Sequence, residues 1–374
     1  MNPCPKRTKE RQIGSMDIFH YLTEMSGQIG PSGHEAASAQ WFKSKFEPLA
    51  DSVTVDALYN VIAFKKATRP MADGRPAPRV MLAAHQDEIA LMAADILPDG
   101  SLRMGQVGGV DPRILPASLV KVHAHQPDGS PVVLEGVVGA AAPVTQSAEE
   151  KKRNYQREEL FVDLGLPPEQ VKALVHIGDL ITLAGPATRL LNDRCASKTM
   201  DDRACVGCLL EAAERLQKMN HACDVYFVAT TQEEVGSKGA TVAAYSIRPD
   251  LAVALDVTHA TIPGSRPDTT VPLDAPAATC GPFIQHRLLE RLKRTAKDHG
   301  IALNTELAVD ETWTDADEIA FAREGVPTVL IDLPLKYMHT TVELLDMNVM
   351  RECGRLLAHF LCDLDEGWDE ALWN

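Results

Sequence analysis

The chain has 374 residues, of which 45% are hydrophobic and 24% are charged, and its formal net charge at pH 7 is −15. This length exceeds one ordinary hydrophobic core and predicts a large α/β domain with a second unit. The acidic balance argues against a nucleic-acid partner, because phosphate binding favours a basic surface, and no apolar run approaches the ~18 residues of a membrane span.

The eight cysteines do not resemble a disulfide framework in a chain of this length. Cys205 and Cys208 form a CxxC without a second pair to complete a zinc site, so we expect them to be small buried side chains of a helix. Residues 1–15 are basic but lack the apolar stretch of a secretion signal, which indicates a disordered tail. The cytoplasm is therefore the expected compartment.

The first part of the chain predicts helices followed by strands. The pattern of residues 16–50 predicts two helices around a turn at 30–33. Residues 53–64 alternate as one or two strands. The apolar run 79–84 predicts a short strand that ends at His85.

The middle of the chain has a different pattern of apolar and polar residues. Short alternating segments such as 119–123 and 132–138 lie between turn signals at Asp99-Gly100 and Asp128-Gly129. Alternation bounded by turns predicts antiparallel strands. We expect a small β-rich insert over residues 96–192, closed by strands near 160–163 and 180–183, with the charged run 149–159 exposed to solvent.

The α/β pattern resumes at residue 193 and continues to the end of the chain. Apolar strands are predicted over 224–231, 251–257 and 327–333, and helices over 205–219, 288–299 and within 340–361. The predicted fold class is α/β, with a mixed, mostly parallel sheet flanked by helices. Residues 16–95 and 193–374 are expected to form one discontinuous catalytic domain.

Metal-ligand and acid/base side chains occur at the ends of these predicted strands and near helix starts. They are His85, Asp87, Asp201, Glu233, Glu234, Asp256 and His339. Ligands of open α/β sheets bind beyond the carboxyl ends of the strands, so we expect these side chains to converge. Two histidines and several carboxylates suit two divalent metal ions, which indicates a hydrolase.

Most of these segments have an ordinary structural interpretation when taken alone. His85 could be a structural histidine, His339 a surface histidine, and Asp201 part of a helix N-cap. Glu233 and Glu234 are harder to explain, because adjacent carboxylates at a buried strand end are costly without a cation. Since neighbours on an extended chain point to opposite sides, we expect one of them to ligate and the other to face the reacting water.

Several strings of this sequence resemble the M42 family of metallo-aminopeptidases, which are two-metal exopeptidases. The matching strings are AAHQDEI, KTMDDRACVG, TTQEEVGSKGA, ALDVT, TDADEIAFAREGVPT and PLKYMHT, with weaker matches at GPSGHE, DALYNVIAFK and GGVDPRILPASLV. They extend from about Met16 to about Leu361. The resemblance implies removal of single residues from peptide N-termini. It also implies homo-oligomers, from dimers to dodecamers, built through the insert.

The family pattern also implies roles for the candidate residues. It places His85 and Asp256 on separate metals with Asp201 bridging them, and Glu234 and His339 complete the two sites. Zinc suits this histidine and carboxylate set best, and cobalt is also compatible with it.

In the same pattern Glu233 is the general base, and Asp87 supports the imidazole of His85. The chain departs from the family at a few positions, none of which removes a ligand. It has Gln86 where Met is usual, Ala90 and Trp313 where Gly is usual, and Ala142-Pro143-Val144 where Pro-Pro-His is usual. These departures bear on substrate preference and assembly, since Trp313 can line or narrow the pocket.

Three other functions stay open. One is another amide hydrolase on the same scaffold, such as a carboxypeptidase or an N-acyl-amino-acid deacylase. A second is a glycosidase, because relatives have at times been labelled endoglucanases. A glycosidase needs two carboxyls roughly 5–9.5 Å apart across the sugar bond, which the adjacent Glu233 and Glu234 fit poorly, and the histidines would have no role. The third is a non-enzymatic binding or assembly protein, which the complete ligand set argues against. The preferred N-terminal residue, the metal used and the oligomer size are left open.

Overall fold

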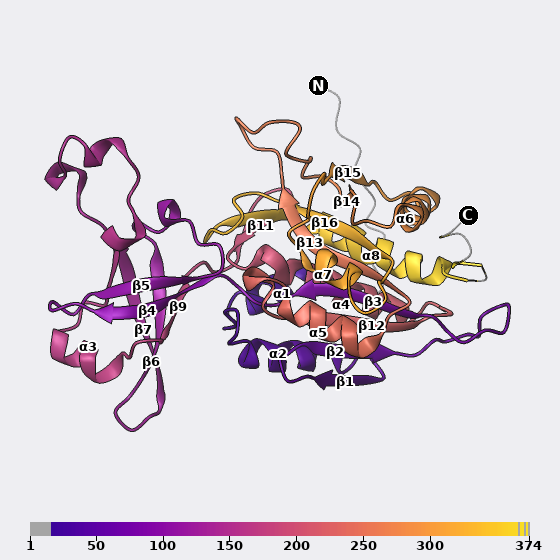
Figure 1. Ribbon diagram of the computed structural model, residues 1–374, viewed down its shortest axis with the longest axis horizontal. Coiled ribbons are helices and arrows are strands. Elements are labelled where there is room, and N and C mark those ends of the chain that lie inside the picture. Colours follow the sequence, from indigo (N-terminus) through magenta and orange to yellow (C-terminus); the bar gives the residue numbers. More distant parts are fainter. Residues whose placement is uncertain (1–15, 366, 370–371, 373–374) are drawn as a thin grey trace.

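The computed structural model describes residues 16–365, 367–369 and 372, so the tail expected over residues 1–15 lies outside the described residues. The described chain forms a layered α/β part and a β-barrel that projects from one end of it (Figure 1). No helix in the described residues is both long enough and apolar enough to cross a membrane.

The α/β part is built on a mixed sheet with the strand order β1-β2-β12-β3-β13-β16-β14-β15. Its central strands β12, β3, β13 and β16 run parallel, and β1, β2 and β14 add antiparallel pairs. The bounds are β1 Ser52–Val55, β2 Val61–Lys65, β3 Arg79–His85, β12 Asp224–Thr230, β13 Leu251–His259, β14 Ala277–Cys280, β15 Asn304–Leu307 and β16 Thr328–Leu335. The central strands are apolar along most of their length because helices cover both faces. The predicted mixed, mostly parallel sheet is confirmed; the edge strands β14 and β15 were not predicted, since neither is a long apolar run.

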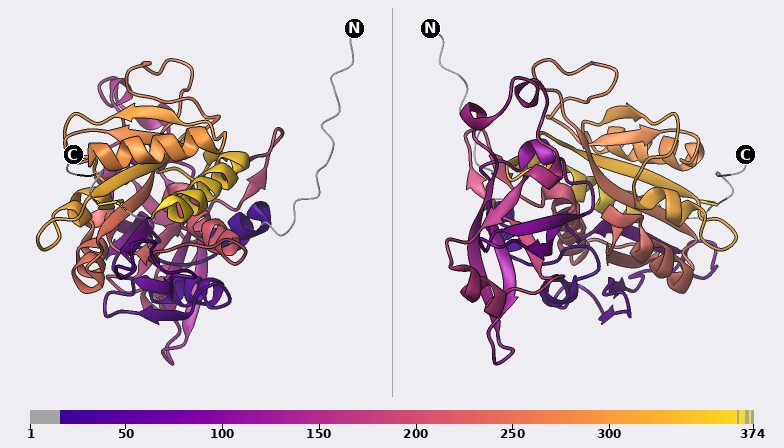
Figure 2. Two further views of the ribbon diagram at one scale, coloured as in Figure 1. Left: turned by 90° about the vertical axis from the view of Figure 1, so that its right-hand side faces the viewer. Right: turned by 60° about the vertical axis from the view of Figure 1, so that its left-hand side comes forward.

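Helices pack on both faces of this sheet. One face contacts α2, α4, α6 and α8, and the other contacts α5 and α7. The bounds are α1 Ile18–Met25, α2 Ala36–Phe46, α4 Met200–Leu216, α5 Lys238–Ile247, α6 His286–Asp298, α7 Asp315–Ala320 and α8 Met347–Asp363. Helix α4 lies between the sheet and α8, which explains why Cys205 and Cys208 are buried in it as predicted. Helices α6 and α8 lie side by side on the surface (Figure 2, left).

The barrel closes in the order β4-β5-β8-β7-β6-β9 through antiparallel pairs. The bounds are β4 Ala90–Ile96, β5 Leu102–Val107, β6 Leu119–His125, β7 Pro131–Gly139, β8 Phe161–Asp163 and β9 Leu180–Leu183, with α3 at Pro168–Leu174. It has its own hydrophobic core, which includes Leu91, Val122 and Ile181. The expected antiparallel β module is thus present. The boundaries at 96 and 192 remain a prediction; the barrel strands themselves run from Ala90 to Leu183, because β4 begins directly after the loop that follows β3.

A small antiparallel sheet joins the two parts of the chain. It consists of β10 Thr188–Arg189, β11 Arg194–Ser197 and β17 Glu343–Asp346. Its register pairs Ser197 with Glu343. This pairing brings a glutamate from the C-terminal part of the chain to the start of α4, where Asp201 lies.

Candidate active site

The structure brings all seven predicted site residues into one cluster at the carboxyl ends of the central strands. His85 ends β3, Asp256 lies near the end of β13, and the rest lie in connections or at the start of α4. Contacts of 4.0 Å or less link His85, Asp87, Asp201, Glu233, Glu234, Asp256 and His339. The parallel order of the strands explains this convergence, because their carboxyl ends share one edge of the sheet.

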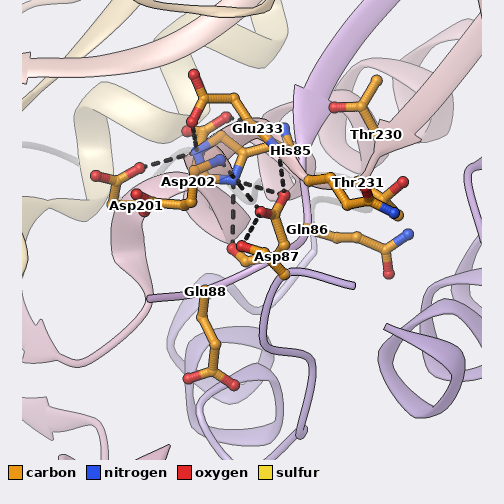
Figure 3. A network of polar contacts seen from close by, with 12 residues as sticks. His85, Gln86, Asp87, Glu88, Asp201, Asp202, Thr230, Thr231 and Glu233 are labelled. Atoms are coloured by element: carbon orange, nitrogen blue, oxygen red, sulfur yellow. Dashed lines mark hydrogen bonds and ion pairs between the residues drawn. The ribbon is translucent and has the colours of Figure 1, made fainter. Parts of the chain in front are cut away.

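The imidazole of His85 is surrounded by carboxylates (Figure 3). Its Nε2 lies 3.0 Å from Asp201 Oδ1, 3.8 Å from Glu233 Oε2 and 4.0 Å from Asp256 Oδ1. Its Nδ1 lies 3.4 Å from Asp87 Oδ1. One ring nitrogen thus faces the cluster while the other faces a carboxylate behind it, which is the arrangement that orients a metal-binding histidine.

The second histidine faces the other side of Asp201. His339 Nε2 lies 3.1 Å from Asp201 Oδ2 and 3.2 Å from Glu234 Oε1. The two oxygens of Asp201 therefore point to two different histidines. A carboxylate placed in this way can bridge two cations.

Two groups of these side chains have ligand atoms close enough to share a metal ion. One consists of His85, Asp202 and Asp256, and the other of His85, Asp201 and Glu234. Asp202 is thus a candidate ligand in addition to the seven predicted residues. Asp202 Oδ1 is buried and has no hydrogen-bond partner among the described residues.

Negative charge is in excess in this buried cluster. Burial raises the pKa of Asp202, Glu233, Glu234 and Asp256 above the usual range of a carboxyl group. Burial also opposes charge on His339, but Asp201 and Glu234 outweigh it and raise the pKa of the imidazole to about 12. Buried carboxylates of this number cost stability unless cations lie among them. The donor set therefore fits divalent metal ions, with both nitrogen and oxygen ligands available.

The two adjacent glutamates do not continue the strand as expected. Strand β12 ends at Thr230, Gln232 has a left-handed φ of 56°, and residues 233–235 form a 3-10 turn, η5 Glu233–Val235. The expectation of an extended chain at this point was wrong. The two carboxylates still diverge, because successive residues of a 3-10 helix are rotated by about a third of a turn. Glu233 faces His85 and Glu234 faces His339.

The backbone is irregular at the start of α4, where Asp201 lies. Asp201 and Asp202 have non-helical backbone angles although they lie within the bounds of α4, and the peptide bond between them is cis. The N-cap position belongs to Thr199.

Glu343 is a residue of the site that the sequence interpretation missed. Its Oε2 accepts hydrogen bonds from the backbone N–H groups of Met200 (2.7 Å) and Asp201 (3.2 Å), and its Oε1 accepts one from His339 (2.8 Å). Burial and the charge of Asp201 raise the pKa of Glu343, while these donors favour its ionised form. One carboxylate thus holds two candidate ligands in place. Nothing in its local sequence, a short strand before a helix, distinguishes it from a surface glutamate.

Asp315 is a second residue that was not assigned a place in the site. It is buried, accepts a hydrogen bond from Thr230 Oγ1, and its Oδ1 has no partner among the described side chains. Burial raises its pKa to about 6. The sequence signal that could have identified Asp315 was the TDADE string, which is part of a match to the family.

Gln86, which stands where the family usually has Met, is held by hydrogen bonds. Its side-chain amide donates to the carbonyl oxygens of Tyr59 (3.0 Å) and Ala229 (3.2 Å) and accepts from Ser38 Oγ (2.9 Å). A buried amide with its partners satisfied carries little penalty. Gln86 therefore supports the loop between His85 and Asp87 without entering the cluster.

The barrel contributes backbone to the site through the turn after β5. The carbonyl oxygen of Gly109 lies 2.9 Å from His339 Nδ1. A Cβ on Gly109 would lie 3.1 Å from His339 Cε1, and one on Gly108 would lie 3.2 Å from Glu234 Cβ. Gly108 also has a φ of +75°. Both glycines are thus required for the close approach of this turn to two candidate ligands.

A cavity of about 780 Å³ opens above the cluster. Its wall includes Trp313 together with Asp201, Glu233, Asp256 and His339. Trp313 therefore lines the cavity, as expected, and its side chain is exposed. This volume is within the range of sites for small ligands.

Comparison with known proteins places this site in a family. The family model described as M42 glutamyl aminopeptidase matches residues 67–356. The lysyl aminopeptidase of Pyrococcus furiosus is 35% identical over 302 residues, which cover 80% of this chain and 83% of that protein. The chain belongs to the M42 peptidase family. It is accordingly an aminopeptidase-type hydrolase that acts on peptide bonds.

Solved structures of M42-like proteins share the fold. A TET aminopeptidase from Thaumarchaeota archaeon SCGC AB-539-E09 aligns with a TM-score of 0.86 and 28% identity over 95% of this chain and 98% of that one. The TET1 peptidase of Pyrococcus horikoshii can assemble into a tetrahedron or a large octahedral shell. It aligns with a TM-score of 0.78 and 27% identity over 93% of this chain and 100% of that one. A Thermotoga maritima protein named as an endoglucanase aligns with a TM-score of 0.72 and 28% identity over 96% of this chain and 99% of that one.

Proposed function

We propose that this M42 peptidase is a two-metal aminopeptidase that removes single residues from the N-termini of peptides. The observation that carries the proposal is the position of Asp201, whose two carboxylate oxygens lie 3.0 Å from His85 Nε2 and 3.1 Å from His339 Nε2. Such a carboxylate can bridge two divalent cations, for which zinc is the best match and cobalt is compatible.

Each side chain then has a defined place. His85 and Asp256, whose Nε2 and Oδ1 atoms lie 4.0 Å apart, would hold one metal, whereas the family pattern had implied separate metals. Glu234 and His339 would hold the other metal, and Asp201 would bridge the two. Asp202 is a further candidate ligand, because it lies within reach of His85 and Asp256. When bound, the metals would polarise the peptide carbonyl and make a water molecule acidic enough to ionise near neutral pH.

Glu233 is the proposed general base. Its Oε2 lies 3.8 Å from His85 Nε2, and Glu233 lines the cavity. Among the described residues, no hydrogen bond holds its carboxylate away from a water molecule there. Burial raises its pKa, as is usual for a carboxylate that exchanges protons near neutral pH. It would take a proton from the attacking water and deliver it to the leaving amine. Asp87 would keep the imidazole of His85 oriented.

The test is a set of aminoacyl reporter substrates offered to the full chain after reconstitution with zinc or cobalt. We expect Glu233→Gln to retain its bound metals and to lose at least about 100-fold in kcat, which is the usual contribution of a positioned acid/base group. Glu324→Gln removes an exposed carboxylate outside the cavity and serves as the control. Turnover by Glu233→Gln at the wild-type rate would show that another group is the base.

The alternatives differ in substrates and in metal dependence. Hydrolysis of N-acylated substrates alone would favour a deacylase or carboxypeptidase. Cellulose hydrolysis that survives a chelator would favour a glycosidase. A folded, metal-loaded protein without hydrolysis of any substrate would favour a binding or assembly role.

We also propose that the chain forms homo-oligomers, from dimers to dodecamers, through the barrel. The TET1 peptidase of Pyrococcus horikoshii supports this by its assemblies. On the outer face of the barrel Leu119 and Val137 are directly opposite each other on β6 and β7, and both are exposed. The cytoplasm remains the predicted compartment, and the seven described cysteines, all free, are consistent with reducing conditions.

A further inference from the structure

The barrel is joined to the α/β part by two connections that meet at its root. The outgoing connection leads from β3 to β4 and contains Glu88. The returning connection leads from β9 through β10 and β11 to α4 and contains Lys198, whose N–H group donates to the carbonyl oxygen of Gly185 at 3.0 Å. The candidate ligands His85 and Asp201 lie at the ends of these same two connections.

A buried ion cluster of Glu88, Lys198 and Arg203, the root cluster, ties the two connections together. The Oε2 atom of Glu88 contacts the ammonium group of Lys198, and its Oε1 atom lies 3.2 Å from Arg203 Nη2. Oε1 also accepts a hydrogen bond from the N–H group of Gly30 at 3.2 Å. The side chains of Glu88, Lys198 and Arg203 are 2%, 10% and 0% exposed. Breaking a buried ion pair is costly, because the remaining charge loses its partner inside the protein.

Arg203 extends the root cluster into the loop that carries the candidate residues of β3. Its Nε donates to the carbonyl oxygen of Gln86 at 2.7 Å, and its Nη1 donates to that of Gln28 at 2.9 Å. Gln86 follows His85 in the chain, and Arg203 lies two residues after Asp201. The planar guanidinium group fixes both the distance and the orientation between α4 and this loop, which a single ammonium group does not. The root cluster thereby fixes the position of Asp201 relative to His85.

The root cluster lies behind the metal cluster and outside the large cavity. In Figure 3 the side chain of Glu88 points away from the carboxylates around His85. Glu88 and Lys198 share with Asp201 and His339 a cavity of about 10 Å³, which is about the volume that one water molecule needs. The root cluster is not among the described residues that line the cavity of about 780 Å³. Its effect on catalysis must therefore pass through the positions of the ligands.

We propose that Glu88, Lys198 and Arg203 are positioning residues that set the separation of the two candidate metal positions. This inference rests on the proposed two-metal function. His85 belongs to one metal position and Asp201 to both, so a shift of α4 against the loop after β3 changes their separation. Partners behind metal ligands usually contribute about 10- to 100-fold in metal affinity.

The main test replaces the ion pair by uncharged side chains in the double variant Lys198→Met/Glu88→Gln of the full chain. The root cluster has two positive charges and one negative charge in the wild type and one positive charge in the variant, so its net charge is unchanged. The new amide oxygen still accepts hydrogen bonds from Gly30 and Arg203. The variant is therefore expected to fold with a melting temperature near that of the wild type. Its affinity for Zn²⁺, measured by competition with a chromophoric chelator, should fall about tenfold or more.

The spacing of the bound ions gives a readout that a purely structural role would not change. In protein loaded with two Co²⁺ ions per chain, the magnetic coupling between the ions depends on their separation and is measured by electron paramagnetic resonance. The double variant is expected to show a changed coupling. At saturating metal, kcat for an aminoacyl reporter should fall about tenfold or more, whereas KM should change less than about twofold, because the root cluster is not among the described lining residues of the large cavity.

Arg203→Lys tests the guanidinium contacts separately. Lysine keeps the positive charge beside Glu88 but cannot donate to Gln86 and Gln28 at the same time in a fixed plane. The affinity for Zn²⁺ and the Co²⁺ coupling should therefore change as they do in the double variant.

Lys65→Met and Glu211→Gln are matched controls, because each removes a buried charge far along the chain from the candidate ligands. Lys65 on β2 is 8% exposed and donates to the carbonyl oxygen of Leu49 at 3.3 Å. Glu211 in the second half of α4 is 1% exposed and lies 2.7 Å from Arg215 Nη2. Both variants should lose stability while their metal affinity and Co²⁺ coupling stay as in the wild type.

Each outcome separates a positioning role from a purely structural one. Wild-type metal affinity and coupling in a folded double variant overturn the proposal and leave the two-metal function standing. Failure of the double variant to fold, or an equal loss of affinity in the controls, also overturns it, because the root cluster would then hold the fold as a whole. A wild-type protein that binds no pair of metal ions overturns the two-metal function and the positioning role with it.

Discussion

Replacement of Glu343 by glutamine tests whether one buried carboxylate organises the site. The side chain of Glu343 accepts backbone hydrogen bonds from Met200, Asp201 and His339. Glutamine has a single acceptor oxygen, and this oxygen can satisfy the N–H groups of Met200 and Asp201. The amide NH₂ of the glutamine would then face the N–H group of His339, which loses its partner.

The size of the effect follows from this lost contact. A hydrogen bond to a charged acceptor contributes about 1.5–3 kcal/mol. Without this hydrogen bond His339 is held less firmly in its metal-binding position, so the affinity for metal should fall by about 10- to 100-fold. A loss of this size is also the usual effect of removing a hydrogen-bond partner of a metal ligand. Metal affinity is measured by competition with a chromophoric chelator, and kcat is measured at saturating metal.

Asp346→Asn is the matched control for Glu343→Gln. Asp346 lies on the same strand, β17, and its Oδ1 accepts a hydrogen bond from the N–H of Asn348 at the start of α8. Asparagine caps a helix as well as aspartate does, so metal affinity should not change. If Glu343→Gln binds metal as tightly as the wild type while its stability falls, Glu343 has a structural role alone and the reasoning is refuted.

Two further predictions concern the barrel turn and the loop that supports Asp87. Gly109→Ala places a Cβ 3.1 Å from His339 Cε1, so the ring must move, and kcat should fall about tenfold or more. Gly105→Ala, in the preceding strand β5, is the control and should leave kcat unchanged, because its Cβ would meet only Met92 O at 4.0 Å. Equal activity of the two variants would contradict a positioning role for the turn. Burial raises the pKa of Glu35 to about 7 from 4.5, so the folded state holds its proton more tightly than the unfolded state, and the contribution of Glu35 to stability declines as the pH rises from 4.5 to 7. The free energy of unfolding of Glu35→Gln, relative to that of the wild type, should therefore rise by up to about 3 kcal/mol between pH 5 and pH 8. Urea titration of the metal-free protein measures it. If the difference in unfolding free energy between variant and wild type did not change with pH, the pKa of Glu35 would not be raised by folding.

Much of the fold and of the site could be predicted from the sequence, because strand burial and strand ends are local properties. Residues 80–84 are all apolar because β3 is covered on both faces, and the same holds for most of β13. A charged residue at the end of such a run must leave the core at the carboxyl edge of the sheet. His85 and Asp256 could therefore be placed near each other without knowledge of the strand order.

The tertiary structure decided the features that depend on contacts between distant segments. Glu343 meets Asp201 because β17 pairs with β11, and Gly109 meets His339 because the barrel folds back onto the sheet. Glu306, which lines the cavity, accepts a hydrogen bond from Thr258, which lies 48 positions earlier in the chain. These contacts produce no periodic pattern of residues in the sequence, because each depends on the register of strands or on the position of a turn in space. The sequence by itself indicated which side chains converge at the carboxyl edge of the sheet, because strand ends are local features, and the packing of distant segments decided what holds those side chains in place.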